Sequence, residues 1–87
     1  MRIEFAKSLS GHDKNHIYLI WKKEGRFAYL VNGTTHTMNN PKKKNEKHYQ
    51  IVKYIPESIS EQFQENESWS DNMICRAVRM YERSINK

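Results

Sequence analysis

The chain has 87 residues, a length that favours a single domain with a modest core. Its formal net charge of +5 favours a polyanionic partner. The single cysteine excludes an internal disulfide and fits a reducing compartment, and no apolar stretch approaches the roughly 20 residues that span a bilayer. We therefore expect a cytoplasmic protein with no signal peptide and no membrane partner.

The positive charge is concentrated in the first two thirds of the chain. Residues 1–55 hold 11 Lys and Arg against 4 Asp and Glu, whereas residues 56–71 hold 5 acidic residues and no basic ones. Residues 72–87 are basic again, with 4 Lys and Arg against 1 Glu. A surface that binds a polyanion is therefore expected in residues 1–55.

The first 55 residues have the pattern of a β-meander. Short runs rich in β-branched and aromatic residues alternate with turn-forming residues. Gly11 and Asn15 tolerate positive φ and suit a shaped loop, Gly25 marks a tight turn, and the pair Asn32 and Gly33 predicts a hairpin. The predicted strands cover residues 3–6, 16–22, 26–31, 34–38 and 47–55. Residues 39–46 contain a proline and are predicted to form a loop.

The last third of the chain predicts a helix at Asp71–Ile85. Ser70 and Asp71 are good N-cap residues, and apolar residues recur after them at helical spacing. This apolar stripe consists of Ile74, Ala77, Val78, Tyr81 and Ile85. Residues 56–68 are acidic and rich in Ser and Gln, which predicts a linker with a helical turn near residues 59–63. Because the stripe must be buried, we expect the helix to pack on the β-domain.

Residues 11–16 (GHDKNH), followed by a hydrophobic strand, resemble a KOW motif, with Asn15 at the position of a glycine. Together with residues 7–10, 32–33, 41–44, 47–48 and 72–78, they make the chain similar to small KOW-domain RNA-binding proteins of Gram-positive bacteria. Those proteins are in turn similar to an archaeal and eukaryotic large-subunit ribosomal protein family. The resemblance implies a mainly β fold, with a small SH3-like barrel over residues 1–55. An acidic linker and a C-terminal α-helix packed on the barrel would follow over residues 56–87.

Two basic clusters are the candidate RNA contacts, because exposed cations neutralise phosphates. The first cluster consists of Lys42, Lys43, Lys44, Lys47 and His48, and the second of Lys7, His12 and Lys14. The alternative for the lysine run is a solvated loop that keeps the protein soluble. Asp13 is expected to shape its loop by capping its own backbone.

Aromatic residues offer a second mode of RNA binding, by stacking on unpaired bases. A small core needs most of them, so Trp21, Phe27, Tyr29 and Tyr54 are expected to pack inside. We take Tyr49 as the exception that stacks on RNA, because it follows the lysine cluster.

Catalytic and metal chemistry have no support in the sequence. The four histidines and Cys75 lack the paired spacing of a zinc site, and no nucleotide-binding or nucleophile motif is present. We therefore expect no enzyme, no cofactor, no metal and no small-molecule substrate. The expected function is binding of structured RNA, and the resemblance points to ribosomal RNA. The alternative is a protein-interaction module of the transcription or translation machinery, which would use the barrel and the apolar helix to hold a ribosomal or other protein partner.

Overall fold

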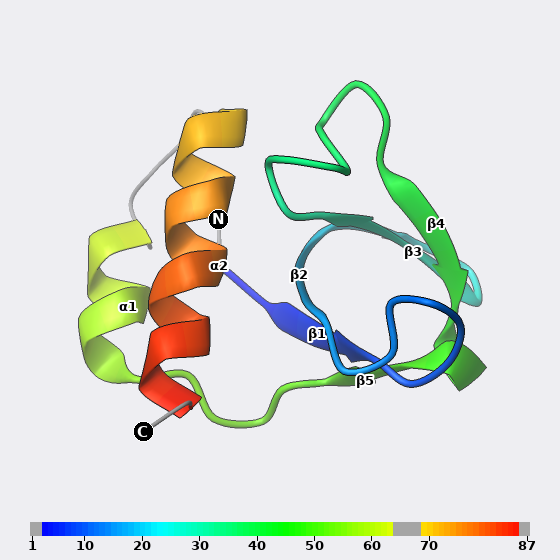
Figure 1. Cartoon of the computed structure of the whole chain (residues 1–87), viewed down its shortest axis with the longest axis horizontal. Coiled ribbons are helices and arrows are strands. Elements are labelled where there is room, and N and C mark those ends of the chain that lie inside the picture. Colours follow the sequence, from blue (N-terminus) through cyan, green and yellow to red (C-terminus); the bar gives the residue numbers. More distant parts are fainter. Residues whose placement is uncertain (1–2, 64–68, 86–87) are drawn as a thin grey trace.

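The computed structural model describes residues 3–63 and 69–85 of the chain, and Figure 1 shows the arrangement of its elements. The elements are β1 (Phe5–Ser8), β2 (Ile17–Glu24), β3 (Phe27–Val31), β4 (Lys42–Asn45), a 3₁₀ turn η1 (Glu46–His48), β5 (Tyr49–Ile51), α1 (Glu57–Phe63) and α2 (Asp71–Ile85). In the described residues, five strands form one antiparallel sheet in the order β4-β3-β2-β1-β5. The prediction of a mainly β fold is confirmed, and the sheet is open, with β4 and β5 at its edges.

The β2–β3 hairpin is the longest paired segment of the sheet. Its turn is made by Gly25, whose φ of +60° is in the left-handed region that glycine adopts without strain. Pairing runs from Glu24 opposite Phe27 to Leu19 opposite Val31, with a bulge between Ile20 and Lys22. This hairpin was predicted from its β-branched and aromatic residues, and the prediction is confirmed.

Alternation along the strands divides the buried residues between the two faces of the sheet. One face, here called the inner face, carries the cluster Ala6, Tyr18, Ile20, Ala28 and Leu30. The other, here called the helix face, carries Phe5, Ile17, Leu19 and Val31, which pack with residues of both helices in a second cluster. Figure 1 shows α1 and α2 beside each other on one side of the sheet.

The predicted helix bounds of α2 are confirmed at Asp71–Ile85. The Ser70 hydroxyl caps the helix by accepting a hydrogen bond from Met73 N at 3.2 Å. The predicted apolar stripe is buried against the sheet except for Ile85, and Tyr81 stacks on Phe5 with ring centroids 4.8 Å apart. The helical turn expected near residues 59–63 is present as α1, while residues 64–68 of the expected linker lie outside the described residues. None of the described helices is long and apolar enough to cross a membrane.

The predictions for residues 34–55 are wrong in three respects. Residues 34–38 form no strand, because the Asn32 carboxamide oxygen accepts hydrogen bonds from Thr34 N at 3.0 Å and His36 N at 2.9 Å and holds a turn. The strand opposite β3 is instead β4, inside the segment predicted as a loop. The strand predicted over residues 47–55 is reduced to β5, preceded by η1.

Gly33 contacts α2 rather than forming a two-residue hairpin. Its φ is +81°, and a Cβ at this position would collide with the Asp71 carbonyl oxygen and lie 2.6 Å from Cys75 N. The same loop is also fastened by the Asp71 carboxylate, which accepts a hydrogen bond from Met38 N at 2.9 Å. The β3–β4 loop therefore positions the first turn of α2 on the sheet.

Candidate functional site

The two predicted basic clusters meet at one end of the sheet. Leu9 N donates a 2.8 Å hydrogen bond to the His48 carbonyl, which places residues 9–16, here called the 9–16 loop, against η1. In Figure 1 the blue loop lies beside the green turn that follows β4. The exposed Lys and His side chains that were predicted as RNA contacts on and beside these two segments form the surface called here the loop-end surface. They are Lys7, His12, Lys14, Lys47 and His48.

The lysine run does not form a set of three equivalent phosphate contacts. Because residues 42–45 form a strand, successive side chains point to opposite faces. Lys43 points outward, whereas Lys42 and Lys44 both point toward Asp13. The prediction that these lysines lie in a loop is therefore wrong, and Lys44, only 9% exposed, is not available to a ligand.

Asp13 is the centre of a buried hydrogen-bond network. Its carboxylate accepts from Lys44 Nζ at 3.0 Å, Lys42 Nζ at 3.1 Å, the Tyr18 hydroxyl at 2.8 Å and the Ser8 hydroxyl at 3.0 Å. The expectation that this carboxylate caps its own backbone is wrong, since its partners lie on β1, β2 and β4. The network therefore fastens the 9–16 loop to three strands and fixes its shape before any ligand binds.

The network also fixes the protonation states of its members. Burial by itself raises the pKa of the Asp13 carboxyl, but hydrogen bonds from Lys44, Tyr18, Lys42 and Ser8 outweigh burial and hold that pKa well below its usual range. Burial, together with the hydrogen bond to Asp13, raises the pKa of the Tyr18 phenol well above its usual range. Asp13 is therefore an ionised acceptor and Tyr18 a protonated donor at neutral pH.

Folding stability should decrease at acid pH because of Asp13. A carboxyl with a lowered folded pKa contributes stability that is complete above its unfolded value of about 3.9 and is lost as the pH falls toward the folded pKa. Lys42→Gln removes one of the partners that lower this pKa, so the variant should be less stable than wild type at pH 7. Urea unfolding should be measured between pH 7 and pH 2. The difference in the free energy of unfolding between wild type and Lys42→Gln should become smaller as the pH falls.

The control for this experiment is Lys22→Gln, which removes an exposed lysine bonded to Glu24 rather than to Asp13. Its stability difference from wild type should stay nearly constant over the acid range where Asp13 titrates. If Lys42→Gln lowers the free energy of unfolding by the same amount at pH 7 and at pH 2, Lys42 does not stabilise the protein through the ionised Asp13 carboxylate.

A second exposed feature lies on the helix face beyond the cover of the helices. Along β3, Val31 is buried, Tyr29 is half-buried and Phe27 is 38% exposed. Lys43 Nζ lies 4.5 Å from the Phe27 ring centroid, and Lys22 Nζ lies 5.7 Å from that of Tyr29. These four side chains, Lys22, Phe27, Tyr29 and Lys43, are called here the aromatic–lysine patch.

The roles of the aromatic residues differ from those expected. Phe27 was assigned to the core and is exposed, and Tyr54 is exposed to 74%. Tyr49, taken as the residue that stacks on RNA, is half-buried and packs against the inner-face cluster. The exposure of Phe27 could have been predicted from its position beside the Gly25 turn. This turn is the end of the β2–β3 hairpin that lies farthest from the helices (Figure 1).

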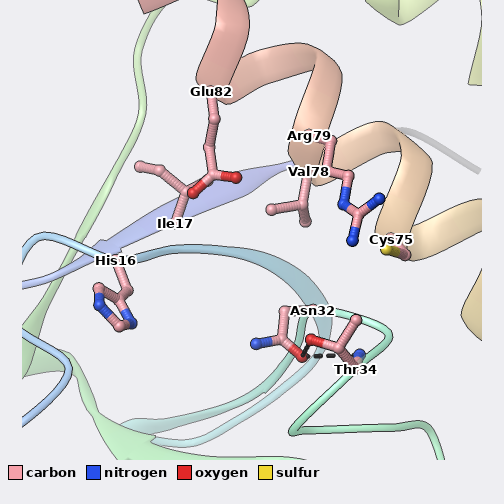
Figure 2. Close-up of a pocket in the computed structure, with 8 residues that line it drawn as sticks. All are labelled: His16, Ile17, Asn32, Thr34, Cys75, Val78, Arg79 and Glu82. Atoms are coloured by element: carbon pink, nitrogen blue, oxygen red, sulfur yellow. Dashed lines mark hydrogen bonds between the residues drawn. The ribbon is translucent and has the colours of Figure 1, made fainter. Parts of the chain in front are cut away.

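A pocket of about 210 Å³ lies between the start of β2, the β3–β4 loop and one side of α2 (Figure 2). Arg79 and Glu82 bring opposite charges to its wall. The Asn32 carboxamide oxygen is already engaged with Thr34, as Figure 2 shows, and its Nδ2 donates to Thr35 at 2.9 Å. This wall offers no excess charge to an ionic substrate. Among the described residues, no three His, Cys, Asp or Glu side chains gather as metal ligands.

No protein-family model matches the chain, and no curated protein matches it at a significant level. The KOW resemblance is therefore an expectation that rests on the motif residues alone.

Proposed function

We propose that this chain is an RNA-binding protein that holds the phosphates of structured RNA on its loop-end surface. The observation that carries the proposal is the 2.8 Å hydrogen bond from Leu9 N to the His48 carbonyl, which brings two separate basic segments together. Lys14 and Lys47 are exposed there, and Asp13, the acidic residue of the 9–16 loop, is already paired with two lysines. Glu46 adds an exposed carboxylate on η1, but Lys7, Lys14 and Lys47 outnumber it, so a phosphate approaching this end meets net positive charge.

The preformed shape of the loop supports structured RNA as the ligand. Cations held at fixed separations select a backbone by its shape, which is how most double-helical RNA is recognised. The further assignments to an SH3-like barrel and to ribosomal RNA follow from the KOW resemblance. The barrel assignment is supported by a sheet whose two edge strands, β4 and β5, are consecutive in the chain and are joined by η1.

The alternative function, a protein-interaction module, relied partly on the apolar stripe of α2. That stripe is buried within the chain, with Ile74 and Ala77 fully covered, so this surface is not free for a partner. RNA binding is therefore the function that the exposed surface supports better.

Binding to a structured fragment of large-subunit ribosomal RNA should weaken steeply with salt. Lys14→Gln combined with Lys47→Gln should weaken binding at every salt concentration. The slope of log affinity against log salt should become shallower by about one unit for each phosphate that the variant no longer neutralises. The measurement is a fluorescence-anisotropy titration at several salt concentrations, with circular dichroism to show that the variant is folded.

The matched control is Arg79→Gln combined with Arg83→Gln, which removes the same charge from exposed positions of α2. This control should keep nearly the wild-type slope. A wild-type slope near zero would reject the proposed function. A protein partner that stays bound at high salt would instead favour the protein-interaction alternative, because an apolar interface is not screened by salt.

A further inference from the structure

The aromatic–lysine patch is an exposed stripe on a strand that is otherwise used for packing. Phe27, Tyr29 and Val31 lie on the same side of β3, because side chains alternate along a strand. The helices cover Val31 and leave Phe27 exposed to 38%. The register places Lys22 and Lys43 on either side of Tyr29, in the neighbouring strands β2 and β4. The patch is thus two aromatic rings flanked by two ammonium groups.

This combination matches the chemistry of a single-stranded nucleic acid. Aromatic side chains stack on unpaired bases whatever the base, and adjacent cations bind the phosphates between them. Two positions along a strand separate the rings by about 6.8 Å, which is twice the 3.4 Å spacing of stacked nucleotides in one strand. An extended RNA strand could therefore place one base on each ring.

The contact between Lys43 and Phe27 does not prevent stacking. Lys43 is exposed, and its ammonium lies 4.5 Å from the ring centroid. A cation over an exposed aromatic ring is held more weakly than a base stacked on it. A base can thus displace the ammonium, which then remains close enough to bind the adjacent phosphate.

The patch adjoins η1, which forms part of the loop-end surface. Phe27 is paired with Asn45, the last residue of β4, and Glu46 N donates a 2.8 Å hydrogen bond to the Arg26 carbonyl. Asn45 in turn caps η1 by accepting from Lys47 N at 3.0 Å. An RNA held at Lys47 therefore reaches Phe27 by passing along the end of β4.

From this geometry we infer that the aromatic–lysine patch binds unpaired bases of a single-stranded RNA segment that adjoins the structured part held on the loop-end surface. Phe27 and Tyr29 provide the stacking surfaces, and Lys22 and Lys43 bind the phosphates. The inference rests on the proposed function for the nature of the ligand, but it assigns separate residues to a separate part of the RNA.

The test uses two RNA probes that differ in one feature. The first is a blunt hairpin, and the second is the same hairpin with a single-stranded extension of six nucleotides containing 2-aminopurine, whose fluorescence falls when it stacks on an aromatic ring. Wild type should bind the extended probe more tightly and quench its fluorescence. Phe27→Leu, which keeps an apolar side chain but removes one of the two rings, should weaken binding of the extended probe about 5- to 100-fold and clearly reduce the quenching.

The blunt hairpin distinguishes this inference from the proposed function. Phe27→Leu should bind it as wild type does, whereas the Lys14 and Lys47 double variant should lose affinity for both probes. Equal wild-type affinity for the two probes, or unchanged quenching in Phe27→Leu, overturns the inference and leaves the proposed function standing. If wild type binds neither probe, both fail. Because Phe27 is exposed, the melting temperature of the variant should stay near that of wild type, and circular dichroism checks this.

Discussion

Replacing Asp13 by Asn should lower the free energy of unfolding by about 3–5 kcal/mol, the cost of removing one partner from a buried ion pair. The change removes the negative charge of the Asp13 side chain, whose Oδ1 lies 3.0 Å from Lys44 Nζ, and so leaves the Lys44 ammonium buried beside a neutral amide. It also weakens the acceptor of the Tyr18 hydroxyl. Small domains have only about 5–15 kcal/mol of stability in total, so urea denaturation should show a much earlier transition or an unfolded protein.

A double-mutant cycle separates the ion pair from other effects of the substitution. Lys44→Met should cost less than Asp13→Asn, because Asp13 keeps Lys42, Tyr18 and Ser8 as donors. Adding Lys44→Met to Asp13→Asn removes the uncompensated buried charge, so the double variant should be clearly more stable than the sum of the two single effects predicts. Strictly additive effects would show that the two residues do not depend on each other.

Replacing Gly33 by Ala should lower the melting temperature by about 12 °C or more, corresponding to a loss of about 3 kcal/mol. Two costs combine at this position. A non-glycine residue at positive φ costs about 1–2 kcal/mol, and overpacking against fixed backbone costs about 1–3 kcal/mol more. The backbone here is the first turn of α2, at Asp71 and Cys75, so the helix must shift away from the sheet. Thermal unfolding followed by circular dichroism measures the effect.

Gly25→Ala is the control, because it carries the cost of positive φ without the cost of overpacking. The difference between the two variants therefore measures the overpacking against α2. Gly25 also has a positive φ, but a Cβ there would meet no atom within 4 Å. Its variant should therefore lose only the smaller, conformational part of the stability. Equal losses for the two alanine variants would mean that contact between Gly33 and α2 contributes nothing to docking of the helix.

Elements whose signal is local could be predicted from the sequence. The cap at Ser70 and the apolar stripe define α2 within its own residues, and the runs around Gly25 define the β2–β3 hairpin. β4 could not be predicted, because a run of lysines has no apolar alternation. It forms a strand because it pairs with β3 and because Lys44 binds the Asp13 carboxylate, which is 31 residues away in the sequence. Residues 34–38 have strand-like composition, but the Asn32 side chain holds them in a turn.

The candidate site could also be predicted only where its features depend on neighbouring residues in the sequence. Positive φ at Gly11 and Asn15, at +86° and +74°, follows from residue type, and the basic character of the loop follows from counting charges. The meeting of the loop with η1 depends on the sheet register, which the sequence did not reveal. Exposure of Phe27 depends on where the helices end above β3, which is a matter of packing between distant segments. The exposure of Phe27 was therefore not predicted, and the buried Lys44 was expected to be exposed.

The composition of β4 has a consequence for how copies of this chain meet one another. An edge strand presents unpaired backbone N–H and C=O groups, and these can recruit the edge strand of a second molecule and begin aggregation. β4 is such an edge, but it is four residues long and three of these are lysines. A second β4 approaching it would bring like charges together, and Lys43 in particular is exposed on this strand. The lysines of β4 therefore disfavour pairing of this edge of the sheet with the same edge of a second molecule.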